Sequence, residues 1–365
     1  MKKIGMKIVF VLGSLQSQRC IKRIRPFIDA GVETVVYAFN RSEEVFNSEI
    51  DFPVEIIGSF TNDVPYLKRL PVLWSSFRKI SSTDADLYYL FGLDMVLMFN
   101  LLCHGKPYVY EESDLVHTYL SSPLARRVME SLDKRAIRKS RLTLFTSEGF
   151  VRYHFGENTP ANVRVVPNRL SSSVSDYPLV PKSAHGNLRI GFVGMIRFKT
   201  VFSFAETFCR RYPQHEFHFY GAFASERERL MFSPLKDLPN CFFHGSYKSP
   251  RDLATIYSEI DWLLSAYDTA YENVRYAEPN KLYESIYFET PIIVSKGTFL
   301  AERVEQWGVG LVVDASDEES LVSWVDGLSE KLTQEKVDRM RTIPKSSVID
   351  HPEGWVDSVL SGTLS

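Results

Sequence analysis

The feature that most constrains the fold is an alternation of short apolar runs with amphipathic segments, which restarts once. The first half contains the runs KIVFVLG, ETVVYAF, DLYYLFG, PYVYEE, LTLFTS and VRVVPN, and the second half contains LRIGFVG, EFHFYG, CFFHG, DWLLSA, PIIVS and GLVVD. Short buried strands that alternate with helices are typical of parallel sheets covered on both faces. The sequence therefore predicts an α/β protein with two parallel sheets.

A segment rich in Ser and Pro, residues 169–187, separates the two series, and 365 residues suffice for two domains with sizeable cores. We expect a first domain over 1–172, a linker over 173–187 and a second domain over 188–350. Helices of the second domain are expected near 200–212, 250–259, 281–289 and 317–332. Two such domains imply a central cleft, with ligands at the carboxyl ends of the strands.

Composition excludes several classes of protein. The chain is 44% hydrophobic and 24% charged, which is ordinary for a soluble globular protein, and no apolar run approaches the roughly 20 residues of a membrane helix. The N-terminal apolar run is short and lacks a small-residue cleavage site, so it fits a first strand better than a signal peptide. The four cysteines are far apart, which indicates reduced core residues in a cytoplasmic protein without a zinc site.

The net charge of −2 conceals an asymmetry between the halves. Residues 1–175 carry 23 Lys and Arg against 18 Asp and Glu, which gives +5, and the remaining residues carry 20 against 27, which gives −7. A mildly basic first half suits an anionic partner, but so small an excess does not indicate nucleic acid as a partner.

Two stretches of the second half carry residues suited to phosphate chemistry. The stretch AEPNKLYESIYFETPIIVS places Lys281 and Glu284 on one face at the start of a predicted helix, before a buried strand. The other, RIGFVGMIRFKT, places a turn at Gly194 directly before Arg197 and Lys199. A glycine turn and cations at a strand end and a helix N-terminus suit a diphosphate.

Glu284 adds a carboxylate that is able to accept two hydroxyl hydrogen bonds, as a ribose offers. A phosphate partner and a diol partner at this spacing describe one end of a nucleotide diphosphate. The competing interpretation is a solvated ion pair between Lys281 and Glu284, which is the common case for such charges. In the first half, the turn at Gly13 has no G-x-G-x-x-G pattern, which counts against a dinucleotide site there.

Over nearly its whole length the chain resembles GT-B glycosyltransferases, and most closely bacterial enzymes of the retaining family 4 type. The segments that carry the resemblance are EPNKLYESIYFETPIIVS, GVGLVVDASDEESL, GFVGMIR, HGSYKSPRDLATIYSEIDWLLSAY, PYVYEESDL and TSEGF followed by VRVVPN. The resemblance implies two Rossmann-like domains that face a cleft, and a C-terminal segment at 351–365, with Trp355, that crosses back to the first domain.

The resemblance also assigns roles to residues. It implies that Glu284 binds the nucleotide ribose, that Lys281 contacts phosphate and that Arg197 contacts the diphosphate. The predicted donor site therefore consists of Gly194, Arg197, Lys199, Lys281, Leu282 and Glu284.

This chain departs from the family pattern at several positions. The first Glu of the family's paired-glutamate motif falls at Tyr276. Glu272 and Glu278 lie close to that position but out of register, so either of them is a candidate for the carboxylate beside the donor sugar. In the first half, Ser113 stands where the family often has His, and Asp114 remains. The catalytic candidates are Asp114, Arg197, Lys281 and Glu278, and the candidates on the acceptor side also include Gly13, Ser14, Glu112 and His117.

The function expected from these residues is transfer of a hexosyl group from a nucleotide-diphosphate sugar to a glycan or glycolipid, in bacterial surface polysaccharide biosynthesis. Retention of configuration is implied by the resemblance alone. Because no D-x-D pair ends a strand, we expect no metal and no other cofactor, with fixed cations stabilising the diphosphate. Two alternatives stay open: a nucleotide-sugar epimerase of the same architecture and a non-catalytic GT-B partner subunit.

The stretch LARRVMESLDKRAIRKSRL, residues 124–142, has seven cations against Glu130 and Asp133, a local excess of +5. Helical spacing places an apolar face opposite a cluster of basic residues. The expected apolar face is Ala125, Val128, Met129, Leu132 and Ala136, and the expected basic cluster is Arg127, Lys134, Arg138 and Arg141. This helix is either an ordinary solvated surface or a peripheral contact with the anionic inner leaflet of a membrane.

Overall fold

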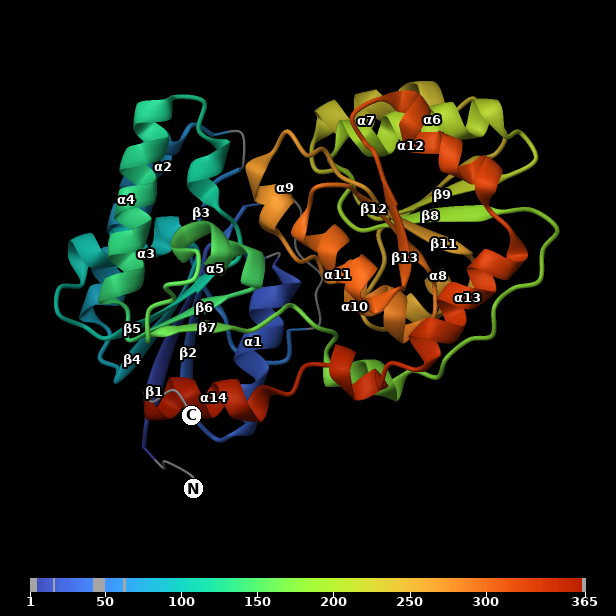
Figure 1. The fold of residues 1–365 in the computed structure, drawn as a ribbon. Coiled ribbons are helices and arrows are strands. Elements are labelled where there is room, and N and C mark those ends of the chain that lie inside the picture. The colour runs from blue at the N-terminus through green and yellow to red at the C-terminus, as the bar shows by residue number, and fades with distance from the viewer. Residues whose placement is uncertain (1–4, 16, 42–49, 62–63, 363–365) are drawn as a thin grey trace. The chain divides into compact units, whose positions relative to one another are not determined.

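The computed structural model describes residues 5–15, 17–41, 50–61 and 64–362. It divides into two compact units (Figure 1). The first consists of Met1–Pro167 with His351–Ser365, and the second of Asn168–Asp350. The C-terminal segment 351–365 thus belongs to the first unit, whereas the first domain, expected to extend to residue 172, already ends at Pro167.

The described residues of the first unit form a seven-stranded parallel sheet in the order β3-β2-β1-β4-β5-β6-β7. The strands are β1 (Lys7–Leu12), β2 (Glu33–Asn40), β3 (Glu55–Ser59), β4 (Leu87–Phe91), β5 (Tyr108–Glu112), β6 (Leu142–Phe145) and β7 (Val163–Val165). The strand order reverses between β1 and β4, and in doubly wound sheets ligands bind at such a switch point. The turn at Gly13 follows β1 at this place.

Helices follow most strands of the first unit, as right-handed crossovers require. They are α1 (Gln18–Asp29), α2 (Tyr66–Ser82), α3 (Leu93–Leu102), α4 (Pro123–Lys139), α5 (Glu148–Phe155) and α14 (Pro352–Ser361), with a 3-10 turn, η1, at Val116–Tyr119. The C-terminal α14 lies beside α1 (Figure 1), where the Trp355 ring contacts Phe27 at 5.6 Å between centroids. The Arg23 guanidinium lies over the Trp355 ring at 5.1 Å and donates to the carbonyl oxygen of Val166.

The second unit contains a six-stranded parallel sheet in the order β10-β9-β8-β11-β12-β13. Its strands are β8 (Arg189–Val193), β9 (Glu216–Tyr220), β10 (Cys241–Gly245), β11 (Trp262–Ser265), β12 (Ile292–Ser295) and β13 (Gly310–Val313). Its helices are α6 (Lys199–Arg211), α7 (Glu226–Phe232), α8 (Leu253–Ser258), α9 (Glu272–Tyr276), α10 (Lys281–Tyr287), α11 (Phe299–Trp307), α12 (Glu318–Val322) and α13 (Glu330–Arg341). The order reverses between β8 and β11, directly beside the turn at Gly194.

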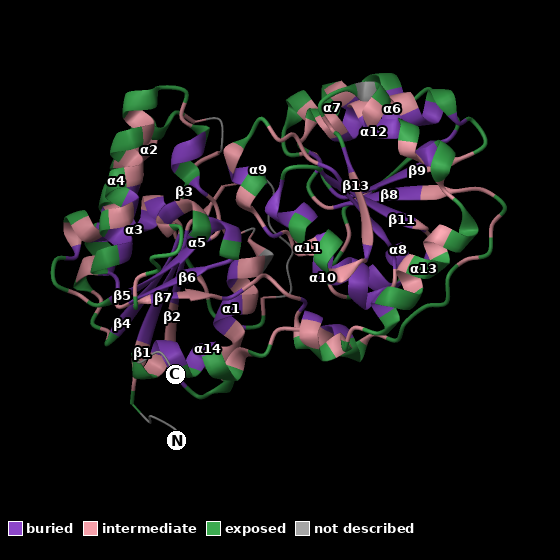
Figure 2. Ribbon diagram, in the orientation of Figure 1, coloured by how far each residue is buried: buried purple, intermediate pink, exposed green. Residues whose placement is uncertain are grey.

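Both faces of the second sheet are buried. Ile292 and Val294 of β12 belong to one hydrophobic cluster, whereas Ile293 between them belongs to another. Side chains alternate across a strand, so the two clusters lie on opposite faces of the sheet. Figure 2 shows buried strands within helices whose outer sides are exposed. Because both faces are buried, the strand sequences are almost entirely apolar. This is the pattern from which parallel sheets were predicted.

Backbones approach closely at the carboxyl ends of β8 and β9. A Cβ added at Gly221 would lie 1.8 Å from the carbonyl oxygen of Gly194, so there is no room for a side chain at Gly221. The Gly194 amide donates to the carbonyl oxygen of Tyr220, and the Gly221 amide donates to that of Gly245. These contacts fix the turn after β8.

The segment expected to be a linker packs against the second unit instead. Val174 is buried in one of its hydrophobic clusters, and Leu170 forms a parallel bridge with Ile349. The Lys182 ammonium donates to the carbonyl oxygens of Tyr257 and Ile260 at 2.8 and 2.7 Å. This Ser- and Pro-rich segment is thus held in place in two ways. Its apolar side chains are buried, and its Lys182 binds carbonyl groups at the end of a helix.

The helix expected over 317–332 is broken. It ends at Val322, continues as a 3-10 turn to Gly327, and a new helix begins at Glu330. The hydroxyl of Ser329 accepts a hydrogen bond from the Leu332 amide at 3.1 Å, which is a typical N-cap of the new helix.

The packed face expected for the basic helix is partly wrong. In α4 the buried residues are Asp133, Ala136 and Ile137, whereas Val128 is 50% and Leu132 is 36% exposed. The helix is rotated so that Asp133 enters the interior, because buried polar groups of the first unit surround that carboxylate.

The four cysteines, Cys20, Cys103, Cys209 and Cys241, are buried and unbridged, as expected. Among the described residues, no helix combines the length and the apolar character needed to cross a membrane.

We predict that Gly221→Ala destabilises the protein by about 3 kcal/mol or more, because the new methyl group overlaps the Gly194 carbonyl oxygen. Gly297→Ala is the matched control: Gly297 also has a positive φ, but a Cβ there meets nothing within 4 Å. Its cost should be only the backbone strain of about 1–2 kcal/mol. Chemical denaturation measures both, and equal losses would contradict the predicted overlap.

A second prediction concerns pH. Burial lowers the pKa of His218 from its ordinary 6.5 to about 4, with His244 acting in the same direction and a hydrogen bond to Glu216 opposing it. A His whose folded pKa is lowered destabilises the fold as pH falls from about 6.5 towards 4, by about 3 kcal/mol at most. Thermal unfolding of His218→Gln should therefore lose less stability than wild type between pH 7 and 4. Parallel curves would refute this assignment.

Candidate functional site

The predicted donor residues meet at the carboxyl edge of the second sheet. Helix α10 is the second of two helices between β11 and β12 and leads directly into β12, so its first residue, Lys281, lies at the edge where both β8 and β11 end. A Cβ added at Gly194 would lie 3.5 Å from Cε of Lys281. The structure thus brings together the glycine turn and the lysine, although 87 positions separate residues 194 and 281 in the sequence.

Lys281 and Glu284 form a buried ion pair, so the solvated interpretation of this pair is wrong. The two residues are 6% and 2% exposed, and Nζ of Lys281 lies 2.6 Å from Oε2 of Glu284. The hydroxyl of Tyr257 donates to the same oxygen at 2.6 Å, and the Asn280 side-chain amide donates to the other. Three donors therefore fix the carboxylate of Glu284.

A tyrosine, Tyr247, contacts the Lys281 ammonium. Nζ lies 3.4 Å from the hydroxyl of Tyr247 and 5.9 Å from the centre of its ring. Burial alone lowers the pKa of Lys281, but Glu284 and Tyr247 more than offset it, and the pKa of the ammonium is raised. Burial raises the pKa of Tyr247 and of the neighbouring Tyr267, so both hydroxyls stay protonated at neutral pH. Lys281 thus remains a fixed positive charge.

The cations after the glycine turn are exposed. Arg197 lies over the ring of Phe198 at 4.8 Å, and the Phe198 ring contacts Tyr267 at 4.8 Å between centroids. Lys199 begins α6 and is also exposed. The edge therefore combines a backbone turn without a side chain, one buried cation and two exposed cations, an arrangement that can bind a polyanion such as a diphosphate.

Two predicted residues lie in the interior. The side chain of Leu282 is buried in a hydrophobic cluster, so its side chain does not line the site. The carboxylate of Glu278 is also buried. It accepts a hydrogen bond from Tyr283 and lies 3.7 Å from Nε of Arg303. In this structure Glu278 anchors α10 and α11, because its carboxylate joins residues of both helices.

On the first unit, Gly13, Ser14 and Asp114 are partly exposed at the carboxyl ends of β1 and β5. A Cβ added at Gly13 would lie 3.2 Å from the guanidinium of Arg41, which pairs with Asp94 at 3.0 Å. The hydroxyl of Ser113 donates to Asp114 at 3.3 Å. These residues remain accessible candidates for the acceptor side.

Two other acceptor-side candidates are not accessible in this structure. Glu112 and His117 are fully buried, and they lie in a cluster with Asp133 and His154. Burial and the charge of Asp133 raise the pKa of the Glu112 carboxyl well above its usual range, and burial lowers the pKa of His154. The expectation that Glu112 and His117 contact an acceptor directly is therefore not supported by their positions.

Sequence reasoning missed four residues of these two sites: Tyr247, Tyr257, Asp133 and His154. Each comes from an element remote in sequence from its partner, so no local motif marks it. Asp133 gave one usable signal, since it interrupts the expected apolar face of its helix with a carboxylate.

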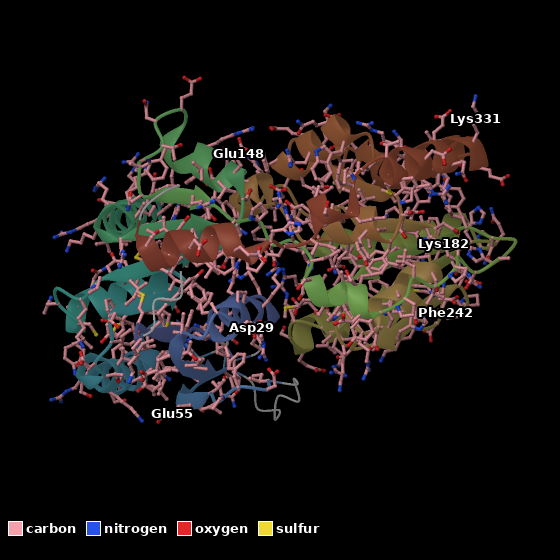
Figure 3. All side chains as sticks on the ribbon, turned by 90° about the horizontal axis from the view of Figure 1, so that it is seen from below. Asp29, Glu55, Glu148, Lys182, Phe242 and Lys331 are labelled. Atoms are coloured by element: carbon pink, nitrogen blue, oxygen red, sulfur yellow. The ribbon has the colours of Figure 1, made fainter. Side chains whose placement is uncertain are left out.

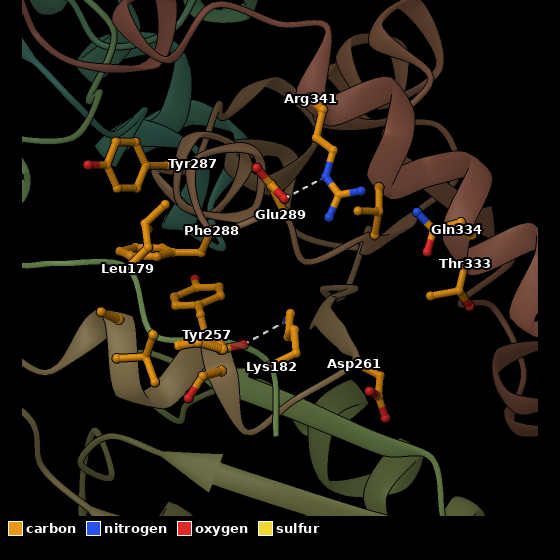
Figure 4. Close-up of a pocket in the computed structure, with 15 residues that line it drawn as sticks. Leu179, Lys182, Tyr257, Asp261, Tyr287, Phe288, Glu289, Thr333, Gln334 and Arg341 are labelled. Carbon is orange, nitrogen blue, oxygen red and sulfur yellow. Dashed lines mark hydrogen bonds and ion pairs between the residues drawn. The ribbon is translucent and has the colours of Figure 1, made fainter. Parts of the chain in front are cut away.

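A pocket of about 550 Å³ lies elsewhere in the second unit (Figure 4). Segment 179–182, α8 and α13 line it, and Lys182 and the Glu289–Arg341 ion pair lie at its walls. None of the predicted donor residues lines this pocket. Glu289 has φ 54, a left-handed conformation in which glycine is more usual, and Arg341 and Lys345 bind its carboxylate.

Comparison with known sequences identifies one informative relative. No sequence profile of a known protein family matches the chain. The chain is 25% identical over 270 residues to the succinoglycan biosynthesis protein ExoL of Rhizobium meliloti. The match covers 68% of this chain and 64% of that protein, so it spans slightly less than two thirds of the relative.

Several solved structures are similar to this chain over almost its whole length. Anabaena HepE in complex with UDP and glucose has a TM-score of 0.71 and 16% identity, over 98% of this chain and 99% of that one. Sucrose-phosphate synthase from Thermosynechococcus elongatus has a TM-score of 0.70 and 14% identity, over 98% and 97%. WaaG, a glycosyltransferase involved in lipopolysaccharide biosynthesis, has a TM-score of 0.69 and 13% identity, over 97% and 100%. The present chain has two parallel-sheet units and is similar to these structures over nearly its whole length. These observations identify it as a protein with the GT-B glycosyltransferase fold.

Proposed function

We propose that this protein is a glycosyltransferase that moves a sugar from a nucleoside-diphosphate sugar to a glycan or glycolipid in the synthesis of a bacterial surface polysaccharide. The observation that carries the proposal is the buried Lys281–Glu284 pair against the Gly194 turn, at the switch point of the second sheet. A buried ion pair contributes little net stability, so its position at a ligand-binding edge favours a role in binding.

The donor diphosphate would lie along the Gly194 turn, where the missing side chain lets phosphate oxygens approach the backbone. The buried Lys281 would neutralise one phosphate, and the exposed Arg197 would contact the other. Anabaena HepE has been solved with UDP and with UDP-glucose, so a uridine nucleotide is the first donor to test. Glu284 would orient Lys281 and accept a ribose hydroxyl after exchanging one of its three present donors.

The chemical contribution of these residues would be charge stabilisation. As the glycosidic bond to the diphosphate breaks, negative charge grows on the leaving oxygen, and fixed cations stabilise it more than they stabilise the intact donor. Lys281 is already desolvated and held by Glu284 and Tyr247, so little reorganisation is needed. We propose that the transfer is retaining and proceeds without a bound metal in the donor site.

The acceptor would bind the first unit, at the carboxyl ends of β1 and β5. Asp114 is the partly exposed carboxylate there and is our candidate for positioning an acceptor hydroxyl. The succinoglycan relative and WaaG both act, by their names, in polysaccharide or lipopolysaccharide synthesis, which supports a glycan or lipid-linked acceptor.

We also propose that α4 docks the enzyme on the anionic inner face of a membrane, as a peripheral cytoplasmic protein. Three apolar residues one turn apart, Leu124, Val128 and Leu132, are exposed along this helix. Exposed cations flank them: Arg127, Arg135, Arg138 and Lys139. An apolar stripe flanked by basic residues suits an interface with anionic lipid. Two of the cations expected there are otherwise engaged, since Lys134 pairs with Glu130 and Arg141 contacts the carbonyl oxygen of Leu360.

The donor site can be tested by calorimetric titration with UDP. Removing the Lys281 charge should weaken binding by about 1.5–3 kcal/mol, the usual worth of a charge-assisted hydrogen bond. Lys281→Met alone leaves Glu284 buried and unpaired, so we pair it with Lys281→Met/Glu284→Gln, which removes both charges and should fold. Lys331→Ala is the control, since Lys331 projects from α13 into solvent (Figure 3).

If the folded double variant binds UDP, GDP and CMP as tightly as the wild-type protein does, this site is not the donor site. A labelled UDP-sugar that is epimerised without any acceptor would instead favour an epimerase.

Membrane docking can be tested by co-sedimentation with liposomes that contain anionic lipid. Each Lys or Arg near such a surface contributes about 1 kcal/mol, so changing Arg127, Arg135, Arg138 and Lys139 to Glu should abolish binding and leave nucleotide affinity unchanged. The matched control changes four exposed cations of the second unit to Glu: Arg210, Arg227, Lys236 and Lys331. Wild-type protein that stays in the supernatant at low salt would contradict the proposal.

A further inference from the structure

The buried polar cluster of the first unit has the composition of a metal site. Glu112 ends β5, Asp133 lies on α4 and His154 lies on α5, so three elements contribute one side chain each. One ligand atom from each residue lies within 4.8 Å of the other two. Nε2 of His154 is 2.9 Å from Oε1 of Glu112 and 3.9 Å from Oδ2 of Asp133.

The three residues are buried, and part of their hydrogen-bonding capacity is unused. Glu112 and Asp133 are both 0% exposed. Within the described part of the chain, Oε2 of Glu112 and Oδ2 of Asp133 accept no hydrogen bond. Buried carboxylate oxygens without a donor are costly, so the structure leaves electron pairs inside the cluster that a cation would satisfy.

The charges of the cluster indicate the same ligand. Two carboxylates face each other across less than 5 Å, and the nearest basic groups are the imidazoles of His154 and His117. Aromatic rings of Tyr153, Phe145 and Phe155 surround His154 and exclude water from its vicinity. In so dry an environment a divalent cation would neutralise both carboxylates at once.

The geometry needs only a small contraction to hold an ion. Ligands about 2.0–2.2 Å from one metal lie roughly 3–4 Å from each other. Nε2 of His154 lies at 2.9 and 3.9 Å from the two carboxylates, and all three ligand atoms lie within 4.8 Å of one another. A second shell is already in place: Tyr110 donates to Oδ1 of Asp133 at 3.1 Å, and Nδ1 of His117 lies 3.5 Å from Oδ2. Second-shell partners of this kind orient ligating carboxylates.

We propose that Glu112, Asp133 and His154 bind one divalent first-row transition metal ion, such as Zn²⁺ or Mn²⁺, inside the first unit. One imidazole nitrogen with two carboxylate oxygens suits these ions better than Mg²⁺ or Ca²⁺, which prefer oxygen alone. The ion would tie the end of β5 to α4 and α5. Asp114 lies two residues after Glu112 and η1 begins two residues after that, so the ion would stiffen the segment that carries the proposed acceptor-side carboxylate. This site is separate from the donor site, where we propose no metal.

The experiment starts with full-length protein freed of metal by dialysis against EDTA. Titration with Co²⁺, followed by its visible absorption, and with Zn²⁺, followed by thermal unfolding, should each saturate at one equivalent. At 100 times the Kd, Zn²⁺ should raise the unfolding midpoint by about 5–10 °C. Less than a fifth of an equivalent bound, with no shift in the midpoint, would overturn the proposal.

Variants locate the ion. Glu112→Gln and His154→Gln should each lose the stoichiometric binding, and Tyr110→Phe, which removes only a second-shell donor, should weaken it about 10–100-fold. His244→Gln is the control for adventitious binding, since His244 forms the His218–His244 pair of the second unit and is exposed. If Glu112→Gln and His154→Gln do not fold, Tyr110→Phe and wild type still decide the question. Unchanged affinity in the ligand variants, or loss of binding in His244→Gln, would also overturn the proposal.

Discussion

The proposed donor site of the second unit depends on one electrostatic arrangement, the burial of Lys281 with Glu284 next to the Gly194 turn. Placing an ammonium group in the interior is costly unless a counter-charge and further hydrogen bonds compensate for lost hydration. Glu284 supplies the charge, while Tyr257 and Asn280 satisfy its remaining electron pairs. The pair therefore requires α8 and α10 to pack in one register.

The same edge depends on a steric constraint. The ends of β8 and β9 approach so closely that there is no room for a Cβ at Gly221, beside the Gly194 carbonyl oxygen. That approach brings the backbone of the turn next to the stem of Lys281 and leaves its open side without a side chain. Backbone and cation thus share one surface, which is what a ligand with several phosphate oxygens requires. The proposed donor site is a consequence of these two constraints acting together.

The first unit uses buried polar groups in a different way. Arg23 is fully buried, where it donates to the end of β7 and lies over Trp355 of α14. The chain leaves the first unit after Pro167 and re-enters it at His351. Arg23 contacts residues near both of these points. In the same unit the Glu112–Asp133–His154 cluster joins β5, α4 and α5. These contacts place the accessible Asp114 at the end of a strongly anchored strand.

Local sequence determined the class of fold and much of the proposed donor site. Apolar runs of four to eight residues between helical segments predict parallel strands whichever neighbours they acquire, because burial on both faces needs side chains that are apolar throughout. The glycine turn and Lys281 were likewise recognisable, since each is tied to one strand end or one helix N-terminus. Tertiary structure alone decided the burial of Glu112, His117 and Glu278, the rotation of α4 and the packing of segment 169–187. Each of these depends on partners far away in sequence, such as His154, Arg303 and Tyr257, and a local pattern of residues cannot encode a distance between segments that only folding brings together.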